Sequence, residues 1–298
     1  MPLKSQPLVS VALVTYNHGP YVAQAIESVL AQKTAFPVEV VIGEDDSTDG
    51  TRQLCQEFAR RHPQQIRLVL RSRDEVVWMD GKPTGRFNFI QTMKDCRGHY
   101  IAVLEGDDYW TDPDKLSTQV QFLEENRAYS ASAHAVLKVT GEKTAPFSRA
   151  IQPQYSLRDL IRMTPIHTSS VVFRRYPFVE DPPKFWWQIK FGDKGLYIQL
   201  AEQGPIGFIN RVMSHYRYHG RGRYSELNHR EIVGGILATY ESMITHLSGQ
   251  NRDYAIHCLA NQYLRGARFG LVKRDPAFVM TMLGKFCRHV VRRRNTAG

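Results

Sequence analysis

An acidic tetrapeptide, Glu105-Gly106-Asp107-Asp108, is the segment of this sequence best suited to chemistry. Three carboxylates within four residues repel one another unless a cation lies between them. Oxygen ligands at the end of a strand suit Mg²⁺ or Mn²⁺, which usually take one or two carboxylates together with substrate phosphates. The alternative is an acidic turn in which Asp108 only caps a helix, and the tetrapeptide alone does not separate the two interpretations.

A second acidic segment covers Glu44, Asp45 and Asp46 and continues as Ser-Thr-Asp-Gly-Thr. Hydroxyl and Asp residues before a helix are ordinary N-caps, so we expect residues 47–51 to form a turn and a cap. Glu44 and Asp45 stand where a carboxylate could hold a base or a ribose hydroxyl. Two acidic strand ends in one sheet favour a ligand site more strongly than either does alone.

The elements that must position these acids alternate between strand and helix. Apolar runs typical of buried strands occur at 9–15, 38–43, 66–70 and 100–104, and apolar residues at helical spacing lie between them. This alternation predicts right-handed βαβ units and an α/β fold with a mainly parallel sheet flanked by helices. Ligands bind beyond the carboxyl ends of such strands, where both acidic segments and Thr15-Tyr16-Asn17 fall.

The later part of the chain is less regular. The patterns predict helices over 113–125 and around 196–201, ending near Gly204, and strands over 169–173 and 206–209. Beyond residue 228, helices are predicted to contain 232–247, 254–268 and 276–291. We therefore expect an α/β domain at 1–228 and a helical C-terminal region at 229–298.

Positive charge is concentrated in the C-terminal region. The 298 residues include 39 Lys+Arg and 29 Asp+Glu, a net charge of +10. Residues 265–298 contain nine basic residues and one acid, so they hold +8 of it and leave the rest of the chain almost neutral. The pI of about 9.5 would favour a non-enzymatic nucleic-acid-binding protein as an alternative. Because the C-terminal segment accounts for nearly all of this charge, we expect no nucleic-acid partner.

Cysteine usage and hydropathy bear on the compartment. The four cysteines are far apart and form no CxxC, which argues against a zinc site or a disulfide framework and fits a reduced compartment. No run approaches the roughly 18 apolar residues of a membrane span. The short polar start leads straight into a strand, so we expect no secretory signal. These features together predict a cytoplasmic protein.

Three segments, in this order and spacing, resemble the family 2 glycosyltransferases: Thr15-Tyr16-Asn17, Glu44-Asp45 with residues 47–51, and residues 100–108 with Tyr109-Trp110. Weaker matches follow at 191–193, 201–204 and 216–220, so the resemblance covers about residues 8–225. It implies a GT-A, Rossmann-like fold, a nucleotide-diphosphate sugar donor, Mn²⁺ or Mg²⁺, and inversion at the anomeric carbon. It also implies a glycan or lipid-linked acceptor and a role in cell-surface polysaccharide synthesis.

The resemblance implies a role for individual residues on the nucleotide side. Thr15 and Asn17 would lie beside the nucleotide, and Glu44 and Asp45 would hold its base and ribose. The family's usual Asp-Asp-Gly pattern is shifted here, because Glu44 and Asp46 flank Asp45. Which of these carboxylates contacts the base therefore stays open.

On the metal side, Asp107 would be the main metal-binding carboxylate, with Glu105 at the first position of the family's DxD motif. Asp108 would lie near the donor sugar or the metal. Arg217 and His219 fall where a late loop closes over the diphosphate or the metal, with exposed loop positions as the alternative. Glu105 stands where Asp is commoner in the family, and its longer side chain can reach the same ion.

Sugar transfer also needs a base within hydrogen-bond reach of the acceptor hydroxyl. Asp193 falls where the family keeps this base, and the alternative is a plain helix N-cap. Retention through a covalent intermediate would need a second carboxylate that the sequence does not offer. The aromatic run Phe185-Trp186-Trp187 could stack on an acceptor sugar, or it could be core.

Two other enzyme classes share part of this pattern. A sugar-nucleotide nucleotidyltransferase would share the nucleotide, the metal and the fold class, but the Gly-rich loop expected after its first strand is replaced by Thr15-Tyr16-Asn17-His18-Gly19. A haloacid-dehalogenase-type phosphatase would need a nucleophilic Asp at the end of the first strand.

The last predicted helix is basic and amphipathic. Phe278, Met282 and Phe286 belong to an apolar stripe among Lys285, Arg288 and residues 292–294. Such helices bind anionic membranes, which would place the protein at the inner face of the membrane. The alternative is a helix that packs on the body and leaves a solvated basic end.

Overall fold

The computed structural model describes residues 6–79, 81–149, 151–220 and 227–296, with side chains as far as Arg288. Its contacts divide the chain into two compact units. The first comprises residues 1–160, 164–183 and 197–219, and the second comprises 161–163, 184–196 and 220–298. The domain boundary expected at residue 228 stays a prediction.

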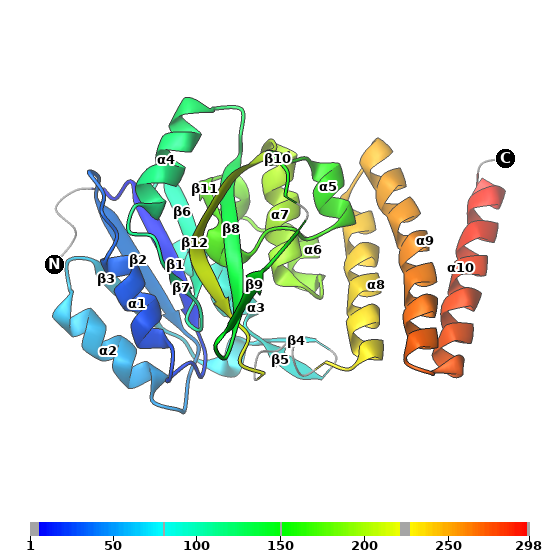
Figure 1. The fold of residues 1–298 in the computed structure, drawn as a ribbon, viewed down its shortest axis with the longest axis horizontal. Coiled ribbons are helices and arrows are strands. Elements are labelled where there is room, and N and C mark those ends of the chain that lie inside the picture. Colours follow the sequence, from blue (N-terminus) through cyan, green and yellow to red (C-terminus); the bar gives the residue numbers. More distant parts are fainter. Residues whose placement is uncertain (1–5, 80, 150, 221–226, 297–298) are drawn as a thin grey trace. The chain divides into compact units, whose positions relative to one another are not determined.

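The first unit begins with four parallel strands in the order β3-β2-β1-β6. Their bounds are β1 (Val9–Thr15), β2 (Val38–Glu44), β3 (Ile66–Leu70) and β6 (Tyr100–Glu105). The helices between them are α1 (Val22–Leu30), α2 (Thr51–Arg61) and α3 (Arg86–Asp95), as Figure 1 shows. Every strand and helix predicted in this part is present, with ends shifted by one or two residues.

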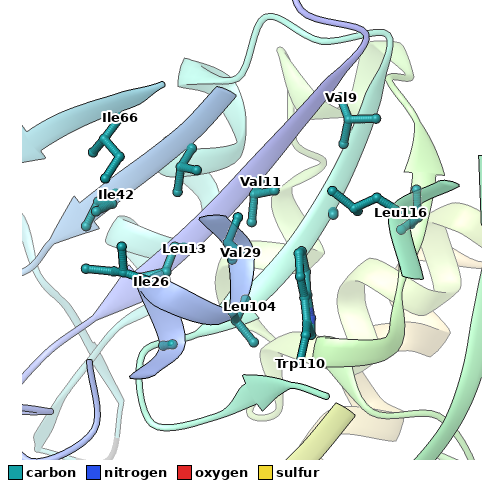
Figure 2. Packing of buried hydrophobic residues seen from close by; sticks show 14 of the residues in the cluster. Val9, Val11, Leu13, Ile26, Val29, Ile42, Ile66, Leu104, Trp110 and Leu116 are labelled. Carbon is teal, nitrogen blue, oxygen red and sulfur yellow. The ribbon is translucent and has the colours of Figure 1, made fainter. Parts of the chain in front are cut away.

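The core of this half lies between the sheet and α1. Figure 2 shows Val11 and Leu13 of β1 packed with Ile26 and Val29 of α1, all of them nearly or fully buried. Burying each of these side chains contributes about 1.5–3 kcal/mol. This packing fixes the direction of β1 and therefore the place where its carboxyl end opens.

The sheet continues beyond β6 with mixed strand directions. Strand β11 (Val172–Arg174) runs antiparallel to both β6 and β8 (Ala131–Thr140), and β12 (Ile206–Arg217) is parallel to β8. Three shorter strands, all antiparallel to their partners, are β7 (Tyr109–Trp110), β9 (Lys143–Pro146) and β10 (Gln154–Tyr155). These strands form one ten-stranded sheet. The other strands of the described part of the chain, β4 (Val77–Met79) and β5 (Lys82–Thr84), form a separate two-stranded ribbon.

The short helices connect these strands. They are η1 (Arg73–Glu75), α4 (Lys115–Glu125), α5 (Leu157–Arg162), η2 (Thr168–Ser170), η3 (Pro177–Val179), α6 (Lys184–Gln188) and α7 (Gly192–Gln203). The strand predicted at 169–173 is wrong in its first half, because η2 occupies it and the ladder begins at Val172. The α/β fold class, with a central sheet flanked by helices, is confirmed.

The second unit contains three long helices, α8 (His229–His246), α9 (Gly249–Val272) and α10 (Pro276–Thr296), which lie side by side in chain order (Figure 1). A capping box between Asn228 and Glu231 begins α8. Close packing needs Gly266, where a Cβ atom would lie 2.9 Å from Val233 and 3.1 Å from the sulfur of Met282. No helix within the described ranges has both the length and the apolar composition needed to cross a membrane.

Candidate active site

The pairing of three parallel strands brings the two acidic segments together. Thr15 is opposite Glu44 in the β1–β2 register, and Val14 is opposite Glu105 in the β1–β6 register. Beyond the ladders, the Asp45 N–H donates to the Thr15 carbonyl at 3.1 Å, and the Gly106 N–H donates to the Val14 carbonyl at 2.8 Å. The candidate site is therefore built at the carboxyl edge of β2, β1 and β6, as expected for a parallel sheet.

Asp107 faces two imidazoles. Its Oδ2 lies 3.2 Å from His219 Nε2 and 3.6 Å from His18 Nε2. Burial raises the pKa of Asp107, but the hydrogen bond with His219 and the nearby His18 outweigh burial and leave this pKa below its ordinary value. Burial lowers the pKa of His18, with the charge of Asp107 opposing this shift. One carboxylate and two imidazoles are a donor set that can hold a divalent cation.

Asp108 and Glu105 of the same loop have other hydrogen-bond partners. Asp108 Oδ1 accepts the Arg217 backbone N–H at 2.9 Å, and Glu105 Oε2 accepts the Thr168 hydroxyl at 2.6 Å. Ligand atoms of Glu105, Asp108 and His167 all lie within 4.8 Å of one another. Burial raises the pKa of Asp108 well above its ordinary value, and the charges of Asp107 and Glu105 raise it further. A cation beside this loop would relieve that repulsion.

The Arg217 side chain holds this loop in place. Its guanidinium donates to the Asp107 carbonyl at 2.7 Å, contacts the Gln24 side chain, and lies 4.2 Å from the centre of the Tyr109 ring. Together with its backbone bond to Asp108, these contacts tie β12 to the loop after β6. The role that the resemblance gives to Arg217 and His219 stays a prediction, and the structure places both side chains at the acidic loop.

Both carboxylate oxygens of Glu44 accept hydrogen bonds from neighbouring residues. It is fully buried, its Oε1 accepts the Ser47 N–H at 2.7 Å, and its Oε2 accepts from Arg52 Nε at 2.5 Å. Asn17 makes a similar bridge, since its N–H donates to Ser47 and its Oδ1 accepts the Thr48 N–H, both at 2.9 Å. These bonds organise the turn that precedes α2.

Asp45 and Tyr16 form a different surface. Asp45 Oδ2 accepts from Arg73 at 2.6 Å, and the Arg73 guanidinium lies 4.0 Å from the centre of the Tyr16 ring. Tyr16 is 39% exposed, so one part of it is free to meet a flat ligand. Burial raises the pKa of Asp45 to about 6, with Arg73 opposing the shift and Glu44 adding to it. Of the two carboxylates predicted here, Asp45 is the one beside an exposed aromatic ring.

Asp193 lies in the second unit, in the first turn of α7. Its Oδ1 accepts the N–H of Lys194 at 2.8 Å. The Lys194 amine is buried and donates to the Met163 carbonyl at 2.7 Å, and burial lowers its pKa to about 7. The assignment of Asp193 as the general base stays a prediction.

The aromatic run is mostly core. Phe185 and Trp186 are buried, Phe185 stacks on His246 at 4.0 Å, and Trp186 Nε1 donates to the Gly192 carbonyl at 2.9 Å. The Trp186 ring also fills the space beside Gly195, where a Cβ atom would lie 2.2 Å from it. Only Trp187 keeps partial exposure.

A small apolar pocket lies beside His167. It encloses about 180 Å³ and is lined by thirteen residues that include Val136, Phe147, Phe208 and His167 itself. The His167 ring packs on Tyr216 at 4.5 Å and on Phe147 at 4.9 Å, while its Nδ1 lies 3.7 Å from Asp108. One imidazole therefore separates the pocket from the acidic loop.

The structure also brings His18, His167 and Arg73 to the site, and no local sequence pattern predicts a role for them. These residues have no ligand spacing among themselves. One pattern could have found His18, because the segments that follow two adjacent parallel strands must meet. Arg73 begins a short 3₁₀ segment and His167 directly precedes another, and the sequence carries no comparable pattern for either.

Comparison with known proteins places the chain in a family. The model of glycosyl transferase family 2 matches residues 10–181. An uncharacterized protein of Mycobacterium tuberculosis is 35% identical over 257 residues, 83% of this chain and 71% of that protein. The chondroitin synthase of Escherichia coli is 26% identical over 228 residues, 73% of this chain and 30% of that protein.

Two solved structures share the fold. S. aureus TarS 1-349 in complex with UDP-GlcNAc has a TM-score of 0.65 at 17% identity, over 95% of this chain and 81% of that one. Mannosyltransferase PcManGT from Pyrobaculum calidifontis, in complex with GDP-Man and Mn²⁺, has a TM-score of 0.58 at 17% identity, over 97% and 87%. From the family model and the fold together, we conclude that the chain belongs to glycosyltransferase family 2 and is a glycosyltransferase with a GT-A-like fold.

Proposed function

We propose that this protein is a metal-dependent, inverting glycosyltransferase that moves a sugar from a nucleotide-diphosphate sugar to a hydroxyl of a glycan or lipid-linked acceptor. The observation that carries the proposal is the buried acidic loop after β6, where Asp107 faces His219 at 3.2 Å and Asp108 is almost fully buried. Such a loop is costly without a cation. The solved complexes of fold neighbours with UDP-GlcNAc and with GDP-Man and Mn²⁺ support the choice of donor and metal.

In this proposal the donor lies along the carboxyl edge of β2, β1 and β6. Tyr16 and Asp45 would receive the base and the ribose, with Arg73 holding both in place. Thr15, Asn17 and Glu44 would shape the loops around the nucleotide, and Glu105, Asp108 and Arg217 would fix the loop at the diphosphate. The cation, held by Asp107 and His219, would be Mn²⁺ or Mg²⁺ and would neutralise charge that develops on the leaving diphosphate.

Transfer would proceed as one in-line displacement. The acceptor oxygen bonds to the anomeric carbon while the bond from that carbon to the diphosphate oxygen breaks, and the electron pair leaves with the diphosphate. Asp193 would take the proton of the acceptor hydroxyl, an effect usually worth 10²- to 10⁴-fold in rate. A single displacement inverts the anomeric configuration.

The test of this function is a screen of nucleotide sugars for metal-dependent binding and transfer. The full-length protein should bind one nucleotide more tightly with Mn²⁺ or Mg²⁺ than with EDTA. Asp107→Asn should abolish the metal-dependent part of that binding. Metal-independent binding that Asp107→Asn leaves unchanged would refute the proposal.

We propose further that the enzyme acts in cell-surface polysaccharide synthesis from the cytoplasmic face of the membrane. The match to a chondroitin synthase supports a glycan acceptor. The basic C-terminal helices support attachment to an anionic surface, but only part of the expected apolar stripe is available for it. Phe278, Val279 and Met282 are buried in the second unit, whereas Leu271, Val272, Met280 and Leu283 are 66%, 72%, 69% and 38% exposed.

Flotation with vesicles that contain anionic phospholipid tests the membrane proposal. The wild type should float with these vesicles and not with neutral ones. A double Leu271→Ser, Val272→Ser variant should lose most of this binding. Leu70→Ser is the matched control, since Leu70 is 46% exposed at the end of β3, in the first unit. Equal flotation of the wild type and the double variant would reject attachment through these helices.

A further inference from the structure

Two imidazoles, rather than one, approach the carboxylate oxygen of Asp107. His219 Nε2 and His18 Nε2 lie 3.2 and 3.6 Å from the same Oδ2 atom. His219 is the residue that the family resemblance brings to the metal, and His18 comes from a different part of the chain. The fold alone brings His18 there, because β1 and β6 are parallel neighbours.

We propose that His18 is a further protein ligand of the divalent cation, beside Asp107 and His219, and that this nitrogen-rich donor set makes the site prefer Mn²⁺ to Mg²⁺. The inference rests on the proposed function, because it requires that a cation binds at Asp107.

The backbone holds His18 in one position. Its carbonyl accepts the N–H groups of Tyr21 and Val22, both at 2.8 Å, so it begins the first turn that leads into α1. The preceding residue, Asn17, has φ 53 and is fixed by its bonds to the loop after β2. The following residue, Gly19, donates its N–H to Asp49 at 2.9 Å. His18 therefore needs little reordering to bind, which lowers the entropic cost of holding a ligand.

The other nitrogen of His18 also fits this role. A metal-bound histidine usually donates its second ring N–H to an acceptor, which fixes the tautomer and the ring direction. His18 Nδ1 is buried and has no hydrogen-bond partner among the residues that the structure describes, and the same holds for Thr15 Oγ1. Both atoms border Gly106, at 3.0 and 2.6 Å from the place where a Cβ atom would lie. We expect the Thr15 hydroxyl to accept from Nδ1–H when the cation is bound, which leaves the lone pair on Nε2.

The donor chemistry decides which metal is preferred. An imidazole nitrogen binds first-row transition metals, Mn²⁺ among them, better than it binds Mg²⁺, which takes oxygen ligands and keeps several waters. With two imidazoles and one carboxylate, the cation has three protein ligands before any nucleotide arrives. We therefore expect the protein to bind Mn²⁺ without a nucleotide, and to bind it more tightly than Mg²⁺.

Pulsed electron paramagnetic resonance of Mn²⁺ tests the inference directly, since couplings to ligand ¹⁴N count the bound imidazoles. The full-length wild type with Mn²⁺ alone should show two coupled nitrogens, and His18→Gln and His219→Gln should each show one. By calorimetry, His18→Gln should bind Mn²⁺ about tenfold or more weakly, as expected for loss of a ligand or its support. His62→Gln is the matched control, because His62 lies at the end of α2, where its ring stacks on Phe58.

A second variant guards against a local folding defect. Thr15→Val removes the proposed acceptor for Nδ1–H and keeps the shape of the side chain. It should weaken Mn²⁺ binding about 10- to 100-fold while both nitrogen couplings remain. Circular dichroism and thermal melting of every variant report whether the fold is retained.

The outcomes separate this inference from the proposed function. If His18→Gln keeps two nitrogen couplings and wild-type Mn²⁺ affinity, His18 is not a ligand. If the wild type shows one nitrogen coupling while metal-dependent sugar transfer persists, His18 does not bind the metal and the inference fails alone. If the wild type binds no Mn²⁺ with or without nucleotide and transfers no sugar, both fail.

Discussion

Gly106 is the residue whose substitution tests the construction of the site most sharply. It lies between Glu105 and Asp107, and a Cβ atom there would lie 2.6 Å from Thr15 Oγ1, 2.8 Å from Thr15 Cβ and 3.0 Å from His18 Nδ1. Real Cβ atoms do not approach other heavy atoms so closely. Gly106→Ala must therefore displace the acidic loop, the end of β1, or both.

The expected cost follows from that overlap. Adding a methyl group to a well-packed site usually destabilises a protein by about 1–3 kcal/mol. In a unit of this size each kcal/mol lowers the melting temperature by about 2–4 °C. Because the displaced atoms include the neighbours of Asp107, Mn²⁺ affinity should fall more than this modest loss of stability would suggest.

The assays are thermal melting and calorimetric titration with Mn²⁺. Gly85→Ala is the matched control, because Gly85 has φ −75 and a Cβ atom there meets nothing within 4 Å. Gly85→Ala should melt and bind as the wild type does. If Gly106→Ala also behaves as the wild type, the close approach of β1 to the loop is not a feature of the active site, and the reasoning is refuted.

Three further predictions concern the base, the nucleotide side and the helical unit. Asp193→Asn should bind the donor normally and lose about 10²- to 10⁴-fold in transfer rate, and normal transfer would remove the assignment as base. The pKa of Asp45 is about 6 in the folded protein and 3.8 ordinarily, so its ionisation lowers the free energy of unfolding as pH rises from about 4 to 6. Urea unfolding should show this fall in the wild type and not in Asp45→Asn. Over the same rise, nucleotide binding should strengthen in the wild type and stay flat in Asp45→Asn. Met282→Ala, at a side chain 3% exposed between α9 and α10, should cost about 2–5 kcal/mol on unfolding, whereas Met280→Ala, at 69% exposure, should cost almost nothing.

The first half of the fold was predictable because its strands are buried on both faces. A continuous apolar run such as 9–15, followed directly by an amphipathic helix, is typical of a strand in a parallel sheet, and the structure confirms β1 to β3 and β6. Strand β8 was missed although it is ten residues long. It begins Ala-Ser-Ala-His-Ala, residues with little preference for strands, and it is stabilised by the ladders with β11 and β12.

The candidate site was predictable only where its residues are contiguous. Glu105, Asp107 and Asp108 are recognisable in the sequence because three carboxylates within four residues have few ordinary structural roles. His18 and His167 reach the same loop through strand pairing and through a 3₁₀ turn, and no local pattern connects them to it. Glu44 is the opposite case. Its position in the sequence suits binding of a ribose, but in the structure its carboxylate accepts hydrogen bonds from Ser47 and Arg52.

The C-terminal helix shows why an amphipathic pattern alone does not name a partner. Periodicity correctly marks Phe278 and Met282 as a buried face, but a bilayer and a neighbouring helix present the same apolar environment to such a face. Gly266 and Gly270 of α9 decide between them, because their missing Cβ atoms leave room for Met282 and for Val279 and Phe278. The apolar face is thus used within the chain, and the membrane attachment that we propose would depend on the basic residues together with the exposed Leu271, Val272 and Met280. Binding of that kind weakens with salt, so raising ionic strength should release the protein from anionic vesicles, whereas an inserted apolar face would stay bound.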